Sequence, residues 1–93
     1  MRITVGTESR TLPDILWTEW STLTSDKENW VYKFTLQNLW PTDIFIENGW
    51  FASVETGYKI LKGNEVEIVT KNIHKINLIS DGDINDNIRI ITN

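Results

Sequence analysis

The sequence predicts an all-β protein, with residues 1–93 forming a single antiparallel β-sandwich or barrel-like domain of about seven short strands. The first observation is compositional: Ile, Val and Thr supply 13, 5 and 11 residues, whereas Ala and Leu supply only 1 and 7. β-branched side chains lose rotamer freedom in helices and pack well on a pleated sheet. The second observation is an apolar period of two residues, and the third is a series of turn signals spaced as short strands require.

The clearest period of two lies in residues 29–37. Trp30, Tyr32, Phe34 and Leu36 are large and apolar, and the residues at 33, 35 and 37 are polar. This alternation predicts a half-buried strand with the four apolar side chains facing the core. Shorter strands are predicted at residues 43–47, 57–61, 65–69, 73–79 and 87–92.

Two of these shorter strands carry further predictions. Residues 65–69 alternate charged and apolar side chains, which points Val66 and Ile68 inward. Residues 73–79 carry apolar side chains on both faces, so this strand is expected to be covered on both sides. Between strands 57–61 and 65–69, the turn 62–64 contains Gly and Asn for a positive φ and predicts a hairpin.

The segment at residues 13–23 breaks the pattern. Leu16, Trp20 and Leu23 recur at the spacing of a helix face, behind Asp14 as a candidate cap. An irregular extended strand with Ile15 and Trp17 on one side accounts for the same residues equally well. The sequence therefore leaves open either a short helix near residues 14–23 or an extended loop.

Charge and composition exclude several classes of function. The chain has 13 acidic and 9 basic side chains, a net charge of −4, and its cations are scattered, so nucleic acid is not an expected partner. No apolar run approaches the roughly 18 residues of a membrane span, and the first residues contain no apolar signal segment. We therefore expect the chain to be made in a cytoplasm and either kept there or incorporated into a particle assembled there.

Catalytic chemistry is not predicted. With no Cys, disulfides, thiolate metal sites and cysteine nucleophiles are excluded. The single imidazole, His74, lies within a predicted strand, where a packed and hydrogen-bonded role is expected. The acidic pairs Glu65/Glu67 and Asp81/Asp83 are neighbours on one strand or turn and cannot flank a substrate. We predict neither an enzyme nor a cofactor.

The strongest metal candidate is the acidic turn before the last strand. Asp81, Asp83 and Asn85 reproduce the first three oxygen ligands of a calcium loop. The sixth position of such a loop requires Gly and the twelfth requires Glu, but Asp86 and Thr92 occupy these positions. No metal is therefore predicted, and calcium binding by this turn is the weaker alternative.

The most unusual feature of the composition is its five Trp residues in 93. Trp30 is expected in the core, but a small two-layer domain has little room for five indoles. Trp side chains favour interfaces, where the ring contacts apolar surface and the N–H finds a partner. The candidate interaction residues lie in loops or in the atypical segment, and they are Trp17, Trp20, Trp40, Trp50 and Phe51. Such a surface is expected either to stack on sugars or to pack on protein.

Four runs of the sequence, taken in their order along the chain, carry a resemblance to a known family. They are FTLQNL at 34–39, TDIFI at 42–46, GYKILKGNEVEI at 57–68 and NIRII at 87–91. This order, together with the opening residues 3–7, resembles small virion proteins of tailed phages, although Asn64 interrupts the Gly-Glu pair usual in them. Residues 12–30 are longer and richer in Trp than in those proteins.

The resemblance implies a β-sandwich without enzymatic activity that decorates the capsid or acts near the head–tail junction. Its implied partner is the major capsid protein or another virion protein, with a homo-oligomer on the particle. Two alternatives remain open. One is a carbohydrate- or receptor-binding module of a phage tail or cell surface, and the other is a small inhibitor of a host enzyme.

Overall fold

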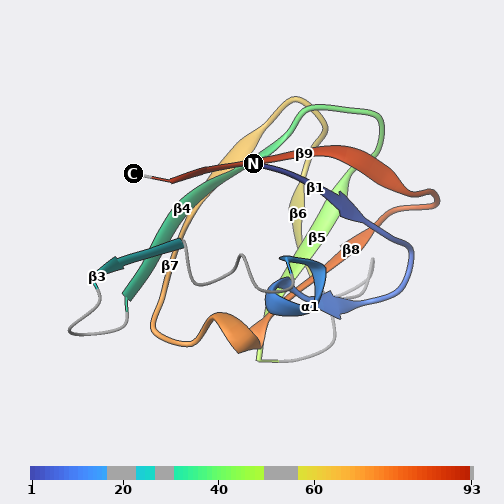
Figure 1. The fold of residues 1–93 in the computed structure, drawn as a ribbon. Helices are drawn as coiled ribbons and strands as arrows, with labels where there is room; N and C mark the ends of the chain where they lie inside the picture. Colours follow the sequence, from blue (N-terminus) through green and yellow to red (C-terminus); the bar gives the residue numbers. More distant parts are fainter. Residues whose placement is uncertain (17–22, 27–30, 50–56, 93) are drawn as a thin grey trace.

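A computed structural model describes residues 1–16, 23–26, 31–49 and 57–92, and it confirms the all-β prediction (Figure 1). Strands dominate these residues, with one α-helix and a 3₁₀ turn. In chain order the elements are β1 (Arg2–Val5), β2 (Arg10–Thr11), α1 (Leu12–Leu16), β3 (Thr24–Asp26), β4 (Val31–Asn38), β5 (Ile44–Asn48), β6 (Tyr58–Ile60), β7 (Glu65–Thr70), η2 (Ile73–Lys75), β8 (Ile76–Ser80) and β9 (Asn85–Thr92).

The strands form two antiparallel sheets that pack against each other. In the first sheet, β4 pairs with β9 on one side and with β7 on the other, and β1 extends the sheet beyond β9. The short strand β3 pairs with the beginning of β4. The second sheet has the order β2-β8-β5-β6. This arrangement is the sandwich alternative of the predicted fold class.

The alternation along β4 faces the core as predicted. Tyr32, Phe34 and Leu36 are buried, and the residues between them are half-buried. Leu36 lies at the centre of the sheet, opposite Val66 of β7 and Ile90 of β9. Val66 is half-buried against the core, and Ile68 is buried, as the alternation in β7 predicted; Trp30 lies outside the described residues.

The predicted hairpin at residues 62–64 is wrong. The turn itself is present, with Gly63 at φ 90° and the Asn64 N–H donating to the Leu61 carbonyl at 2.9 Å. However, β6 belongs to the second sheet and β7 to the first, so the turn crosses from one sheet to the other. Alternation shows which side chains face inward but not which sheet a strand joins.

The strand predicted at residues 73–79 begins only at Ile76, because residues 73–75 form the 3₁₀ turn η2. The Asn72 side chain caps this turn by accepting the His74 N–H at 3.1 Å. Within β8, the consecutive residues Ile76, Asn77 and Leu78 are all buried, in agreement with the predicted cover on both faces.

The helix in the atypical segment begins earlier than predicted and has a different cap. α1 starts at Leu12, and the Thr11 Oγ1 accepts the Asp14 N–H at 3.3 Å, so Thr11 and not Asp14 acts as the cap. Asp14 instead lies in the first turn, where its carboxylate pairs with Arg10 at 3.1 Å. Residues 17–22 of the predicted helix or loop lie outside the described residues.

Candidate functional site

The structure describes one of the predicted interaction residues. Trp40 lies two residues beyond the end of β4, and it is 57% exposed. The other candidates lie outside the described residues, and their role in a contact surface stays a prediction; they are Trp17, Trp20, Trp50 and Phe51. The candidate site is therefore built around Trp40.

Trp40 lies where three loops meet at one end of the sandwich. The loops comprise residues 39–43, 61–64 and 81–84, and each connects a strand of one sheet to a strand of the other. The first two loops are joined beside Asn38, whose N–H donates to the Asn64 carbonyl at 2.9 Å and whose carbonyl accepts from Gly63 at 2.6 Å. The third loop is held by the Asp81 N–H, which donates to the Asp43 carbonyl at 3.0 Å. We call this region the loop end (Figure 1).

Two buried amides hold the loop end together, and both side chains have 0% exposure. The Asn38 Nδ2 donates to the carbonyls of Thr42 at 2.8 Å and Ile60 at 2.9 Å. The Asn85 Nδ2 donates to the Asn38 Oδ1 and to the Thr42 carbonyl, both at 2.9 Å. Each amide hydrogen thus has an acceptor, and the conformation of the Trp40 loop is fixed from inside.

Two hydroxyls extend this network to the third loop. The Ser80 Oγ donates to the Asp83 carbonyl at 2.5 Å, and it lies 2.5 Å from the Thr42 Oγ1. Because a serine hydroxyl has one hydrogen, the Thr42 hydroxyl is the donor to Ser80. Thr42 therefore contacts both the amide pair and the hydroxyl that orders residues 81–84.

The surface of the loop end exposes several apolar side chains beside charged ones such as Lys62, Asp81 and Asp83. Trp40 and its neighbour Leu39 are exposed, as are Leu61 on the second loop and Ile84 on the third. The Trp40–Pro41 peptide bond is cis. The Lys62 Nζ lies over the Trp40 ring, 4.5 Å from its centroid, at the distance of a cation–π contact.

Asp43 anchors the loop that carries Lys62. Its Oδ1 accepts the Lys62 N–H at 2.9 Å, and its Oδ2 lies 3.6 Å from the Lys59 Nζ. The hydrogen bond from the Lys62 backbone lowers the pKa of the Asp43 carboxyl, burial opposes this shift, and the charge of Lys59 adds to it. An ionised Asp43 therefore fixes the backbone from which Lys62 reaches the indole.

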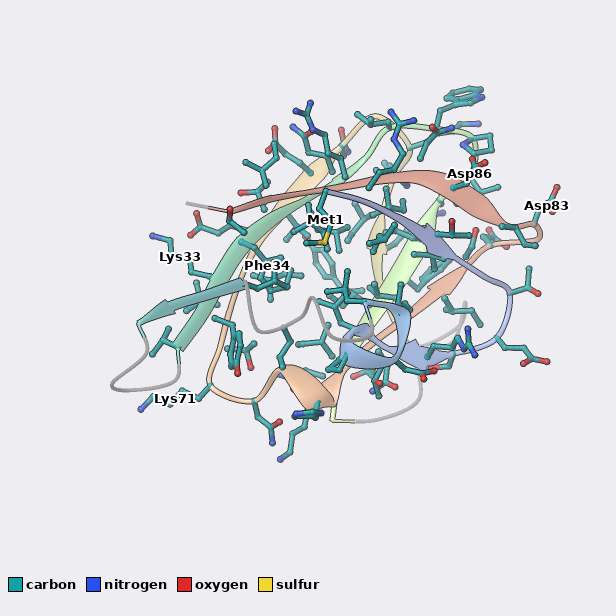
Figure 2. The ribbon with its side chains drawn as sticks, in the orientation of Figure 1. Met1, Lys33, Phe34, Lys71, Asp83 and Asp86 are labelled. Carbon is teal, nitrogen blue, oxygen red and sulfur yellow. The ribbon has the colours of Figure 1, made fainter. Side chains whose placement is uncertain are left out.

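The other residues singled out from the sequence are not brought together. His74 is exposed in the turn η2, so the prediction that it is packed within a strand is wrong. Glu65 and Glu67 are exposed on β7. Asp81 and Asp83 are exposed on the third loop, with Asp83 at its tip (Figure 2).

The structure does not assemble the calcium candidate. Asn85 turns inward, and its Oδ1 accepts the Asn87 N–H at 2.9 Å instead of approaching Asp81 and Asp83. Within the described ranges, no three His, Asp or Glu side chains form a group that could hold a metal ion.

Sequence reasoning missed the residues that build the site. Asn38 was not selected as a functional candidate, and Asn85 was selected only as a calcium ligand, a role different from the buried amide that the structure shows. One signal was available: the inward alternation of β4 continues from Leu36 to Asn38, which places an amide on the core face. An amide in that row requires buried partners.

Comparison of the chain with models of protein families, with curated proteins and with solved structures gave no match. Among the residues that the structure describes, no helix is long and apolar enough to cross a membrane.

Proposed function

We propose that this protein is a non-enzymatic structural subunit that docks on a larger protein assembly through the loop end. Following the resemblance to small virion proteins of tailed phages, the assembly is a phage particle and the chain is a capsid decoration or head-associated subunit. The observation that carries the proposal is the exposed indole of Trp40 on a loop held by buried hydrogen bonds.

A fixed, exposed Trp is the side chain expected at the centre of a protein interface. Binding energy is concentrated in a few aromatic anchors, and an anchor that is already ordered loses little entropy on binding. The side chains of Asn38 and Asn85 order the Trp40 loop from inside the domain. Leu39 and Leu61 extend the apolar surface that a partner would cover.

The position of Lys62 favours protein over sugar as the bound partner. Sugar stacking uses an open face of an aromatic ring, and the Lys62 ammonium already covers one face of the indole. The flanking Leu side chains add apolar area but no hydrogen-bonding groups for sugar hydroxyls. The exposed indole and its Leu neighbours match the centre of a protein interface, which is rich in aromatic residues.

Co-sedimentation with purified phage particles tests the proposal. The wild-type chain is expected to sediment with particles and to bind saturably, whereas Trp40→Ser is expected to bind about 30-fold more weakly, corresponding to about 2 kcal/mol for a central aromatic anchor. Tyr58→Ser is the matched control, because Tyr58 is also an exposed aromatic residue but belongs to β6, away from Trp40. Circular dichroism verifies that both variants fold.

The outcomes that follow would either contradict the proposal or identify a different function. Absence of binding to any particle, or equal binding by Trp40→Ser and wild type, would contradict it. A saturable change in Trp fluorescence with free glycans would identify a carbohydrate-binding module. Inhibition of a purified host enzyme, without particle binding, would identify an inhibitor.

A further inference from the structure

The strand β7 lies at an edge of the first sheet. It pairs with β4 from Tyr32 to Gln37, and on its other side no described strand pairs with it. An edge strand presents backbone N–H and C=O groups on which another strand can pair. At six residues, β7 is long enough to template such a pairing.

The outer face of β7 combines charge with an apolar residue. Glu67 and Lys71 are exposed, and between them Val69 is 59% exposed. Lys71 projects outward just beyond the end of the strand (Figure 2). Native edge strands are commonly protected by charges, and here charges of both signs flank an exposed apolar side chain.

The side of β7 that faces the second sheet borders a shallow open groove. The groove lies between β7 and the edge strand β6, and its apolar lining includes Ile46, Tyr58, Ile68 and Val69. Tyr58 is 66% exposed at its rim. A strand added to β7 would place alternate side chains over this groove.

We propose that two copies of this chain pair through β7, antiparallel about a two-fold axis, with Val69 facing Val69 of the second copy. In this register, Glu67 of each copy faces Lys71 of the other. Facing residues in an antiparallel pair lie on the same side of the sheet, which limits the registers available to β7. A register centred on Glu67 would oppose two like charges, whereas the one centred on Val69 joins two opposite-charge pairs around an apolar contact.

The same register also pairs residues on the inner face of β7, the side that faces the second sheet. Ile68 faces Thr70 of the second copy, so the second copy's inner row covers the exposed side of the groove beside Tyr58. The two first sheets then become one continuous sheet, and the β7 edges disappear. A strand from another protein would need the same order of acid, apolar residue and base, and this chain supplies that order itself in Glu67, Val69 and Lys71.

This dimer is independent of docking through the loop end. β7 enters from the loop end at Glu65, and its pairing surface is centred on Val69 near the other end of the strand. Trp40 thus remains accessible in the dimer. Loss of either property is expected to leave the other intact.

Sedimentation velocity over a concentration series tests the pairing in the full chain. Wild type is expected to show a reversible monomer–dimer equilibrium. Glu67→Lys or Lys71→Glu alone is expected to weaken dimerisation about tenfold, because each creates two like-charge contacts. The double variant Glu67→Lys/Lys71→Glu exchanges the charges and is expected to restore the wild-type dimer.

Two further sets of variants test whether the dimer uses the register centred on Val69. Glu65→Lys makes the same charge change on the same strand but has no facing residue within β7 of the second copy, so dimerisation is expected to be unchanged. Because the chain has no Cys, Val69→Cys places one thiol on the two-fold axis, where facing Cα atoms are close enough for a disulfide. Rapid oxidation to a covalent dimer is expected for Val69→Cys but not for Thr35→Cys on β4.

The proposal is overturned if wild type stays monomeric at every concentration up to millimolar, or if the charge exchange fails to restore the dimer. Loss of the dimer in Glu65→Lys, or equal oxidation of Val69→Cys and Thr35→Cys, overturns it as well. The thiol experiment keeps the test decisive should a charge variant fail to fold.

Discussion

The two ends of the sandwich close the core with different chemistry. At the loop end, the buried side chains are polar, and Asn38 and Asn85 satisfy each other and the surrounding carbonyls. At the opposite end, α1 and η2 cover the core with apolar side chains, among them Leu12, Leu16 and Ile73 (Figure 1). The named core side chains are buried at both ends, but only the loop end carries the exposed Trp40.

The difference shows how a small domain can hold a surface side chain in place. Hydrogen bonds depend on direction, so the amide pair specifies one conformation of the Trp40 loop. Apolar packing depends mainly on volume and tolerates conservative exchange. We therefore expect substitutions at the loop end to change stability and docking together, and substitutions at the opposite end to change stability alone.

The largest effect is expected from Asn38→Ala. This change removes three hydrogen bonds and leaves the buried Ile60 carbonyl without the side-chain partner, which should lower the free energy of unfolding by about 4 kcal/mol. Urea denaturation followed by circular dichroism measures the loss. Asn77→Ala is the matched control, since Asn77 is also buried but, among the described residues, its side chain donates only to the Lys75 carbonyl, and about 1 kcal/mol is expected. Equal losses in the two variants would show that the amide pair is not special.

A slightly smaller effect is expected at the opposite end from Leu12→Ala. Leu12 has 0% exposure, and truncating it leaves a cavity that should cost about 3 kcal/mol. Leu12→Met retains the volume and should cost less than about 1.5 kcal/mol. Both variants are expected to bind the docking partner as tightly as wild type under conditions where they are folded. A loss of binding in folded Leu12→Met would refute the separation of the two ends.

The same comparison explains which parts of the structure the sequence could predict. Side-chain alternation identified the inward faces of β4 and β7, because burial of one face imposes a period of two. It could not assign β6 and β7 to different sheets, because the turn at Gly63 is compatible with a hairpin or a crossing. The deciding contact, between Gly63 and the Asn38 carbonyl, joins residues far apart in the chain.

The site was less predictable than the fold for a similar reason. Exposed aromatic residues are visible in the sequence, and Trp40 was selected from its position beside Pro41. The amides that order it, Asn38 and Asn85, are 47 positions apart and have no local signature as a pair. The helix cap was likewise sought at Asp14, whereas the backbone geometry assigns this role to Thr11.

A moderate effect is expected from removing the helix cap with Thr11→Ala. The Thr11 hydroxyl oxygen accepts the Asp14 N–H at the start of α1, and loss of this cap should cost about 1 kcal/mol. Thr11→Ser keeps the oxygen and should retain most of the stability. Thermal and urea denaturation compare the two variants with wild type. If serine destabilises as much as alanine, the lost contact is the Thr11 methyl group and not the cap.

The smallest effect is expected at Asp43, as a difference in pH dependence. The pKa of Asp43 is lowered in the folded chain, chiefly by the Lys62 N–H, relative to an unfolded value of about 3.9. Its stabilising contribution is therefore present above about pH 4 and is lost as the pH falls through the lower folded pKa. Asp43→Asn, which keeps an oxygen to accept the Lys62 N–H, should melt below wild type at neutral pH, and the two melting temperatures should converge in acid. Asp86→Asn, at an exposed position of β9, should follow the wild-type curve throughout. Parallel curves for wild type and Asp43→Asn would instead mean that the charge of Asp43 contributes nothing to holding the Lys62 loop against Trp40.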